Sequence, residues 1–275
     1  MFLEIYILLF LLGAIFGSFA NVCIYRLPKE QSIVTKGSHC PNCKKKINWL
    51  YNIPIFSYFY LQAKCKNCKK KIPLQYLIVE IISAISFPAI YYFLGFTIET
   101  MLLIFLFFIY LIIFFIDLKH YIIPNSLNYI LIISGLIKNF MPDIDEFIFT
   151  NLISSIVGGI LGYGMIWIII ELYRRLKKIE GMGLGDAKLF CGIGLWFGYQ
   201  SVFIIIFLAS ITALLAILPS LMKGNLNLKS KIPFGPFIIF GNLIFLIFQL
   251  YIQTICRFYD NHAVLKMVHI RACGI

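Results

Sequence analysis

Two aspartates lie where strongly apolar segments of the chain end or begin, and this placement predicts acid–base chemistry. Asp117 follows the apolar run Met101–Ile116, and Asp186 follows the glycine-rich stretch "GMGLG" at 181–185. An ionisable side chain inside a membrane is costly and therefore needs a reason. If the two carboxyl groups meet, they can share one proton, so that one acts as a base on water while the other polarises a carbonyl group.

The residues around Asp186 suit such a site, because glycines let the backbone bend and let another helix or an extended substrate approach closely. We expect a supporting loop that contains Gly181, Gly183, Gly185 and Lys188. We also expect Glu80 to be an auxiliary acid of the site. A purely structural alternative stays open. In it, Asp186 only caps the N-terminus of its helix, and Asp117 pairs with Lys119 or His120.

Four cysteines in a polar, Lys-rich segment form the second group of residues that could do chemistry. They occur as "CPNC" (Cys40, Cys43) and "CKNC" (Cys65, Cys68). Two such pairs supply four thiolates for a tetrahedral Zn²⁺, and the neighbouring lysines help to keep the thiols deprotonated. Metal binding could then fold a segment that has almost no core of its own. The alternatives are two disulfides, which a reducing compartment disfavours, or four cysteines without a role.

The elements that must position these residues are membrane helices. The 275-residue chain is 61% hydrophobic and 17% aromatic, too apolar for one soluble core, and only helices or closed barrels satisfy the backbone in lipid. We therefore predict an all-α, polytopic membrane protein. The first apolar run lacks a basic leading region, so we interpret it as a helix rather than a cleaved signal peptide. The apolar runs predict about eight helices, at 2–22, 76–94, 99–117, 126–141, 148–172, 186–199, 201–222 and 232–255.

The charges predict how these helices are oriented. Of the 24 Lys and Arg residues, 20 fall on alternate loops, and 11 of them lie between Arg26 and Lys71. The positive-inside rule places these loops in the cytoplasm and both termini outside. Helix 99–117 then arrives at the cytoplasmic face and helix 186–199 departs from it, so both aspartates lie at one membrane depth. The net charge of +12 reflects this orientation and attraction to anionic lipid, and we expect no nucleic acid partner.

Several longer motifs carry a resemblance to a known family. In chain order they are "GSFANVCIYRLP" (17–28), the two cysteine pairs, "NIPIFSYFYLQAKC" (52–65), "LIVE" (77–80), "DLKHYIIPN" (117–125), "GMGLGDAKL" (181–189) and "PFGPF" (233–237). With these motifs the chain resembles the prepilin peptidase family, which comprises the bifunctional leader peptidases and N-methyltransferases of type IV pilin and type II secretion systems.

The resemblance implies an intramembrane aspartic endopeptidase with Asp117 and Asp186 as its catalytic residues. It implies that the enzyme removes the short basic leader of prepilins and pseudopilins on the cytoplasmic side of the bacterial inner membrane. It also implies methylation of the new N-terminus with S-adenosylmethionine. Gln75 and Asn125 depart from the family pattern, which often has Arg and Asp there. The competing functions are a membrane zinc-ribbon adaptor and a transporter, neither of which cleaves peptides.

The resulting domain organisation has four parts. We expect a first transmembrane helix at 1–27, a cysteine-rich zinc-binding loop at 28–75, a transmembrane peptidase domain at 76–255 and a tail without assigned role at 256–275.

Overall fold

The chain folds into helices joined by loops. The computed structural model describes residues 2–34, 37–142, 148–177, 183–222 and 232–261. Within these ranges there are no strands, only two isolated bridges between residues in the cysteine-rich loop. Six of the described helices are long and apolar enough to cross a membrane. The expectation of an all-α, polytopic membrane protein is therefore confirmed.

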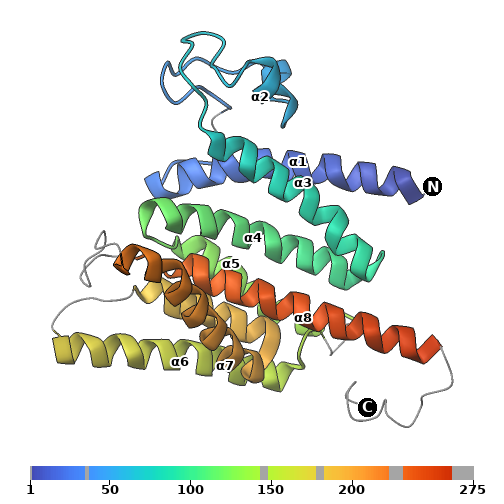
Figure 1. Ribbon diagram of the computed structural model, residues 1–275, viewed down its shortest axis with the longest axis vertical. Helices are drawn as coiled ribbons and strands as arrows, with labels where there is room; N and C mark the ends of the chain where they lie inside the picture. Colours follow the sequence, from blue (N-terminus) through green and yellow to red (C-terminus); the bar gives the residue numbers. More distant parts are fainter. Residues whose placement is uncertain (1, 35–36, 143–147, 178–182, 223–231, 262–275) are drawn as a thin grey trace. The chain divides into compact units, whose positions relative to one another are not determined.

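The α-helices follow one another along the chain as labelled α1 to α8 in Figure 1. The long helices are α1 (Phe2–Arg26), α3 (Leu74–Leu94), α4 (Ile98–His120), α6 (Leu152–Lys177), α7 (Leu184–Met222) and α8 (Gly235–Asn261). The short ones are η1 (Leu27–Lys29), η2 (Trp49–Asn52), α2 (Phe56–Tyr60), α5 (Asn125–Ile137) and η3 (Lys138–Phe140).

The difference between six membrane helices and the expected eight has two causes. Helix α5 has 13 residues, fewer than the roughly 20 that a membrane span needs. Helix α7 has 39 residues and contains both expected helices, 186–199 and 201–222, on either side of a break at Gly198. The remaining helices begin or end up to six residues from their expected positions, which is common where apolar runs fade into polar loops.

The chain divides into two compact units, Met1–Ile116 and Asp117–Ile275. In the first unit α1 packs along α3, and glycines of α1 set the distance between them. A Cβ atom on Gly13 would lie 2.5 Å from the carbonyl oxygen of Ser83, and one on Gly17 would lie 2.7 Å from the Cα of Glu80. Only glycine permits this approach, which brings the two backbones into direct contact. The division is geometric, and the four domains expected from the sequence stay predictions.

In the second unit α6 packs against the first half of α7 through glycines of both helices. A Cβ atom on Gly158 would lie 2.4 Å from the carbonyl oxygen of Gly194, and one on Gly162 would lie 2.5 Å from that of Phe190. Because the residue numbers rise on α6 as they fall on α7, the two helices are antiparallel. This close backbone contact fixes the first half of α7, which carries Asp186.

Helix α7 turns back on itself at Gly198, whose backbone (φ 80°, ψ 178°) is outside the helical region. Before the turn, the ring of Phe197 contacts that of Phe245 on α8, at a centroid distance of 6.2 Å. After the turn, Ala209 lies against Gly241, which is earlier in α8. The second half of α7 therefore runs back toward the start of α8, and Figure 1 shows the two halves of α7 folded together. A residue with a side chain would be strained at Gly198.

Candidate active site and metal centre

Asp117 is buried near the end of α4 and is held by the start of α8. Its carboxylate oxygen Oδ2 accepts a hydrogen bond from the backbone N–H of Gly235 at 2.9 Å, and the side chain is 4% exposed. Gly235 is the first residue of α8, so this carboxylate satisfies one of the N–H groups that a helix leaves unpaired at its N-terminus. The contact fixes the orientation of Asp117.

Asp186 is buried in the first turn of α7 and interacts with the residue that precedes this helix. Its Oδ2 accepts the backbone N–H of Gly183 at 3.3 Å, while its own N–H donates to the Gly183 carbonyl at 3.1 Å. An acid that reaches back from the third helical position in this way resembles the acidic half of a capping box. The capping role that we considered as an alternative is thus present, and it orients the carboxylate.

The two aspartates lie within electrostatic range of one another, since the charge of Asp117 acts on Asp186. Ile123, in the connection between α4 and α5, lies between the start of α7, which carries Asp186, and the start of α8, which binds Asp117. Its Cβ would be 3.2 Å from a Cβ on Gly185, and its Cδ1 would be 3.2 Å from one on Gly235. The end of α4 and the starts of α7 and α8 therefore converge around these buried carboxyl groups.

The start of α5 joins the same convergence through polar contacts with α7. The side-chain amide of Asn128 donates to the carbonyl of Gly185 at 3.2 Å, and Lys188 Nζ donates to Asn125 Oδ1 at 2.7 Å. Lys188 thus binds α5 rather than either aspartate in the contacts described. Asn125, where the family often has an acid, is the acceptor of this lysine. Gly181 lies outside the described residues.

Sequence reasoning missed the roles of Gly235 and Ile123. A Cβ atom on Gly235 would lie 2.6 Å from Asp117 Oδ2, so any side chain there would displace the carboxylate. The motif "PFGPF" contained the signal, because a glycine between two prolines that opens a helix leaves its N–H free to bind an anion. Ile123 belongs to the motif "DLKHYIIPN", but an isoleucine in an apolar sequence has no feature that predicts its position between two helices.

The four expected metal ligands lie together in the first unit. The sulfur atoms of Cys40, Cys43, Cys65 and Cys68 all lie within 4.8 Å of one another, and Cys40 Sγ is 3.9 Å from Cys68 Sγ. Zn–S bonds of about 2.3 Å in a tetrahedron place sulfurs about 3.8 Å apart, so the cluster fits a Zn²⁺ ion. All four thiols are free, and none forms a disulfide.

Both cysteine pairs have the same backbone geometry. Cys40 N–H donates to the Lys45 carbonyl and Cys65 N–H to that of Lys70, at 3.0 and 2.9 Å. The residue after the second cysteine of each pair, Lys44 or Lys69, has positive φ, 57° and 58°. Two equivalent turns thus bring their four sulfurs together, and such a cluster could hold a metal ion.

Electrostatics within the cluster favour a bound cation. The backbone N–H of Cys68 lowers the pKa of the Cys65 thiol to about 7. The backbone N–H of Lys70 favours the Cys68 thiolate, but burial and the neighbouring sulfurs outweigh it and raise the pKa of Cys68 to about 11. Without a metal, one thiolate therefore keeps the next thiol protonated. A divalent cation removes this conflict, since it neutralises the charge of several thiolates at once.

Glu80 lies in the first unit and binds the cysteine-rich loop, so it does not belong to the two-aspartate site in the contacts described. The side chain is buried in α3, and Oε2 accepts the backbone N–H of Ile55 at 2.7 Å. Ile55 has φ 63° and ψ −55°, a conformation that is strained for a β-branched residue. Glu80 therefore holds a strained turn of the loop.

Comparisons with known proteins give the same family on both halves of the chain. Residues 11–94 match the model of the bacterial peptidase A24 N-terminal domain, and residues 103–218 match that of the type IV leader peptidase family. No solved structure matches the chain.

Three relatives carry the name prepilin leader peptidase/N-methyltransferase. The protein of Vibrio cholerae serotype O1 is 34% identical, over 87% of this chain and 96% of its own length. That of Pseudomonas aeruginosa is 30% identical, over 86% and 88%, and that of Aeromonas hydrophila is 28% identical, over 92% of each chain. With two buried aspartates at converging helix ends, a four-cysteine cluster and these matches, the chain belongs to the type IV leader peptidase family.

Proposed function

We propose that this chain is an intramembrane aspartic endopeptidase that removes the short basic leader of type IV prepilins and pseudopilins, with Asp117 and Asp186 as its catalytic residues. The observation that carries the proposal is the burial of both carboxyl groups at one convergence of helix ends. The names of the relatives support prepilins as substrates. The family match and the site disfavour a zinc-ribbon adaptor or a transporter, because neither needs two buried carboxyl groups within electrostatic range of each other.

The proposed cleavage needs one ionised and one protonated carboxyl group. The ionised aspartate takes a proton from water, which attacks the scissile carbonyl, while the protonated aspartate donates a hydrogen bond to the carbonyl oxygen. Gly235 and Gly183 orient the two carboxylates through their backbone N–H groups. Because the backbone rather than a mobile side chain supplies these donors, the orientation is fixed before substrate binds.

The same enzyme methylates the N-terminal amine that cleavage exposes. S-adenosylmethionine supplies an activated methyl group: the amine nitrogen attacks the methyl carbon, the C–S bond breaks with its electron pair going to sulfur, and the amine then loses a proton. The N-methyltransferase in the names of the relatives supports this second activity. The chain must bind the amine deprotonated and exclude water from it.

The cysteine cluster has a structural role in this proposal and binds about one Zn²⁺ per chain. Four cysteine ligands fill a tetrahedral site and leave no position for a hydrolytic water, so the metal does not take part in cleavage. Elemental analysis of reduced, freshly prepared protein measures this stoichiometry. Metal-free protein that keeps a folded loop would contradict the assignment.

We place the enzyme in the bacterial inner membrane as a multi-pass protein in contact with lipid, with its active site facing the cytoplasm. The Lys-rich composition of the loop supports this orientation, because basic loops stay in the cytoplasm. Accessibility of an added cysteine in the tail to a membrane-impermeant reagent tests the topology.

One assay tests both activities. Purified enzyme is incubated with candidate prepilins and S-adenosylmethionine, and mass spectrometry determines the N-terminus of the product. We expect a product that begins just before the hydrophobic helix of the pilin and carries one methyl group. Uncleaved precursors throughout would favour the adaptor or the transporter instead.

A further inference from the structure

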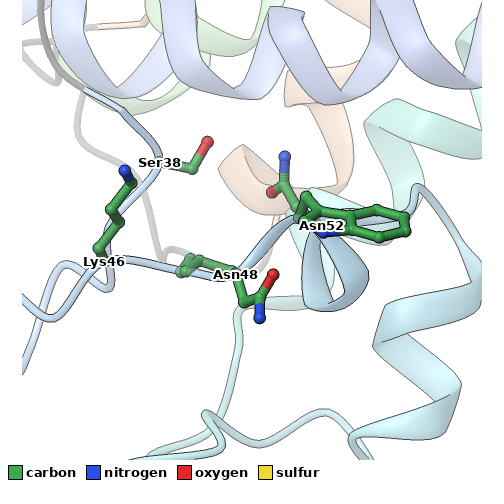
Figure 2. Close-up of a pocket in the computed structure, with 6 residues that line it drawn as sticks. Ser38, Lys46, Asn48 and Asn52 are labelled. Carbon is green, nitrogen blue, oxygen red and sulfur yellow. The ribbon is translucent and has the colours of Figure 1, made fainter.

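A pocket of about 550 Å³ lies beside the cysteine cluster, in the first unit, and belongs to none of the sites described above. Its volume falls in the range of small-molecule sites, about 300–1,000 Å³. Figure 2 shows four of the polar side chains that surround it, and six residues line it: Ser38, Lys46, Ile47, Asn48, Trp49 and Asn52.

The first cysteine pair builds one wall of this pocket. His39 and Lys46 form an antiparallel bridge across the turn, and the N–H of Ile47 donates to the Ser38 carbonyl at 2.9 Å. These two contacts hold the segment of Ser38 beside that of Lys46. Their positions therefore depend on the metal, because the turn has almost no apolar core.

The opposite wall is η2, and it is tied to the second cysteine pair. The amine of Lys66 bonds to the hydroxyl of Tyr51 and lies 4.1 Å from the centre of its ring. The hydroxyl of Ser57 donates to the Leu50 carbonyl at 3.3 Å. The four-cysteine cluster thus supports both walls of the pocket.

Glu80 fixes the far end of this wall. Ile55 follows η2 by three residues, and its strained turn is closed by a bond of 2.6 Å from the Phe56 N–H to the Pro54 carbonyl. The bond between Glu80 and the N–H of Ile55 keeps this turn against α3. A strained turn that is held by a buried acid costs stability, and such turns gather where position matters for function.

The lining groups have the chemistry that an adenosyl group requires. Trp49 is 74% exposed. An exposed indole face can stack on a purine ring. The amides of Asn48 and Asn52 can each donate and accept, as the hydrogen-bonding edge of adenine requires. Lys46 supplies a cation for a carboxylate, and Ser38 a hydroxyl for a ribose.

We propose that this pocket binds S-adenosylmethionine, with Trp49 stacked on the adenine, Asn48 and Asn52 on its edge and Lys46 paired with the amino-acid carboxylate. The inference rests on the proposed methyltransferase function and deepens it, because it locates the methyl donor in the cysteine-rich loop. It also makes Glu80 a positioning residue for the donor rather than a catalytic residue of the peptidase.

Direct binding to the full-length enzyme tests the proposal without any turnover. S-adenosylhomocysteine is titrated into purified protein, and binding is followed by calorimetry and by tryptophan fluorescence. We expect Trp49→Ala and Asn52→Ala to weaken binding about fivefold or more, as the loss of base stacking or of a paired hydrogen bond does. Gln31→Ala, which removes an exposed amide of the loop outside both the cysteine turns and the pocket, should bind normally.

The fluorescence signal locates the ligand. The chain has three tryptophans, and Trp167 on α6 is also exposed while Trp196 is buried. Trp49→Phe should lose the ligand-dependent change in fluorescence, whereas Trp167→Phe should keep it. Zinc content is measured for each variant, because a variant with an unfolded loop should lose its zinc. Where that happens, Asn52→Asp replaces the variant in the binding test.

Three results would overturn the proposal, and they differ in what they say about the function. If wild-type enzyme methylates and binds the ligand but all pocket variants bind equally well, the pocket is wrong and the methyltransferase stands. If wild-type enzyme neither binds the ligand nor methylates, the methyltransferase half of the proposed function is wrong as well. If Trp49 responds to vesicles of anionic lipid and not to the nucleoside, this surface contacts the membrane.

Discussion

The two-aspartate site and the cysteine-rich loop differ in what holds their functional side chains in place. Around Asp117 and Asp186, helices pack through glycines and the backbone supplies the hydrogen bonds. In the loop at 28–73, only Cys40 and Ser57 are buried among the described residues, so there is almost no apolar core. The first site can form from apolar packing alone, while the second has four clustered thiols that a metal ion could hold together.

Because of this difference, we expect that cleavage and methylation can be lost separately. Changes in the loop should leave the helix ends around the aspartates intact, because each unit has its own internal packing. The predictions below test this separation, beginning with the largest expected effect.

Replacing either aspartate should abolish cleavage without changing zinc content. Because both carboxyl groups act in one step, we expect Asp117→Ala or Asp186→Ala to lower the cleavage rate by at least about 10³-fold, and the double variant to be no worse. A gel assay for precursor and product measures the rate, and wild-type cleavage should show a bell-shaped pH profile. Glu171→Gln, which removes a half-buried acid paired with Arg174 and Arg175, is the matched control. Substantial cleavage by either single Asn variant would contradict the shared proton.

Removing the four thiols should abolish methylation and leave cleavage unchanged. With Cys40, Cys43, Cys65 and Cys68 changed to Ser, we expect loss of zinc and of methylation while cleavage continues, because the loop no longer folds but the helix ends still meet. Mass spectrometry of the cleaved pilin reports the methyl group. Cys191→Ser, in α7, should keep both zinc and methylation. A fully methylated product from the four-serine variant would show that methylation does not depend on the cysteine cluster.

Adding one methyl group at the start of α8 should damage the peptidase selectively. In Gly235→Ala the new Cβ would lie 2.6 Å from Asp117 Oδ2, so the carboxylate must move, and we expect cleavage to fall about 10- to 100-fold. Gly164→Ala on α6 is the control, since no atom lies within 4 Å of its added Cβ. Equal rates for the two variants would show that the bond from Gly235 does not position Asp117.

Acid should release the metal before it affects helix packing. Cys68, whose pKa without metal is about 11, must lose a proton when the metal binds, so metal affinity falls as the pH falls. We expect zinc to be retained at about pH 8 and released toward about pH 5. A colorimetric zinc indicator measures release, and circular dichroism should show that most of the helix content persists. Retention of zinc throughout this range would argue against a thiolate site.

The smallest effect should come from Glu80. Glu80→Gln keeps the shape of the side chain but weakens the hydrogen bond to Ile55, so we expect methylation to fall about threefold through a raised KM for the methyl donor, with cleavage unchanged. Ser86→Ala on the same helix controls for changes in α3 itself. A loss of cleavage instead would place Glu80 in the peptidase.

Much of the candidate site followed from particular residues. Asp117 and Asp186 stood out because acids are expensive beside long apolar runs, and the cysteines stood out because their spacing is that of a metal site. A boundary between two apolar runs was also predicted at residue 200, two residues after the break that the structure has at Gly198. Each of these signals is local, so it can be recognised without knowing how the chain folds.

By itself, the sequence determined that this protein is an all-α membrane protein with two carboxylates at the ends of apolar segments and four cysteines in paired spacing, because hydrophobicity and ligand spacing act over short stretches of chain. Only the tertiary structure decided that Gly235 binds Asp117, that Ile123 lies between Gly185 and Gly235, and that Glu80 serves the loop. These contacts join residues far apart in the chain. Their partners are selected by helix packing, where glycines allow backbones to approach, and apolar patterning alone does not specify which glycine faces which carboxylate.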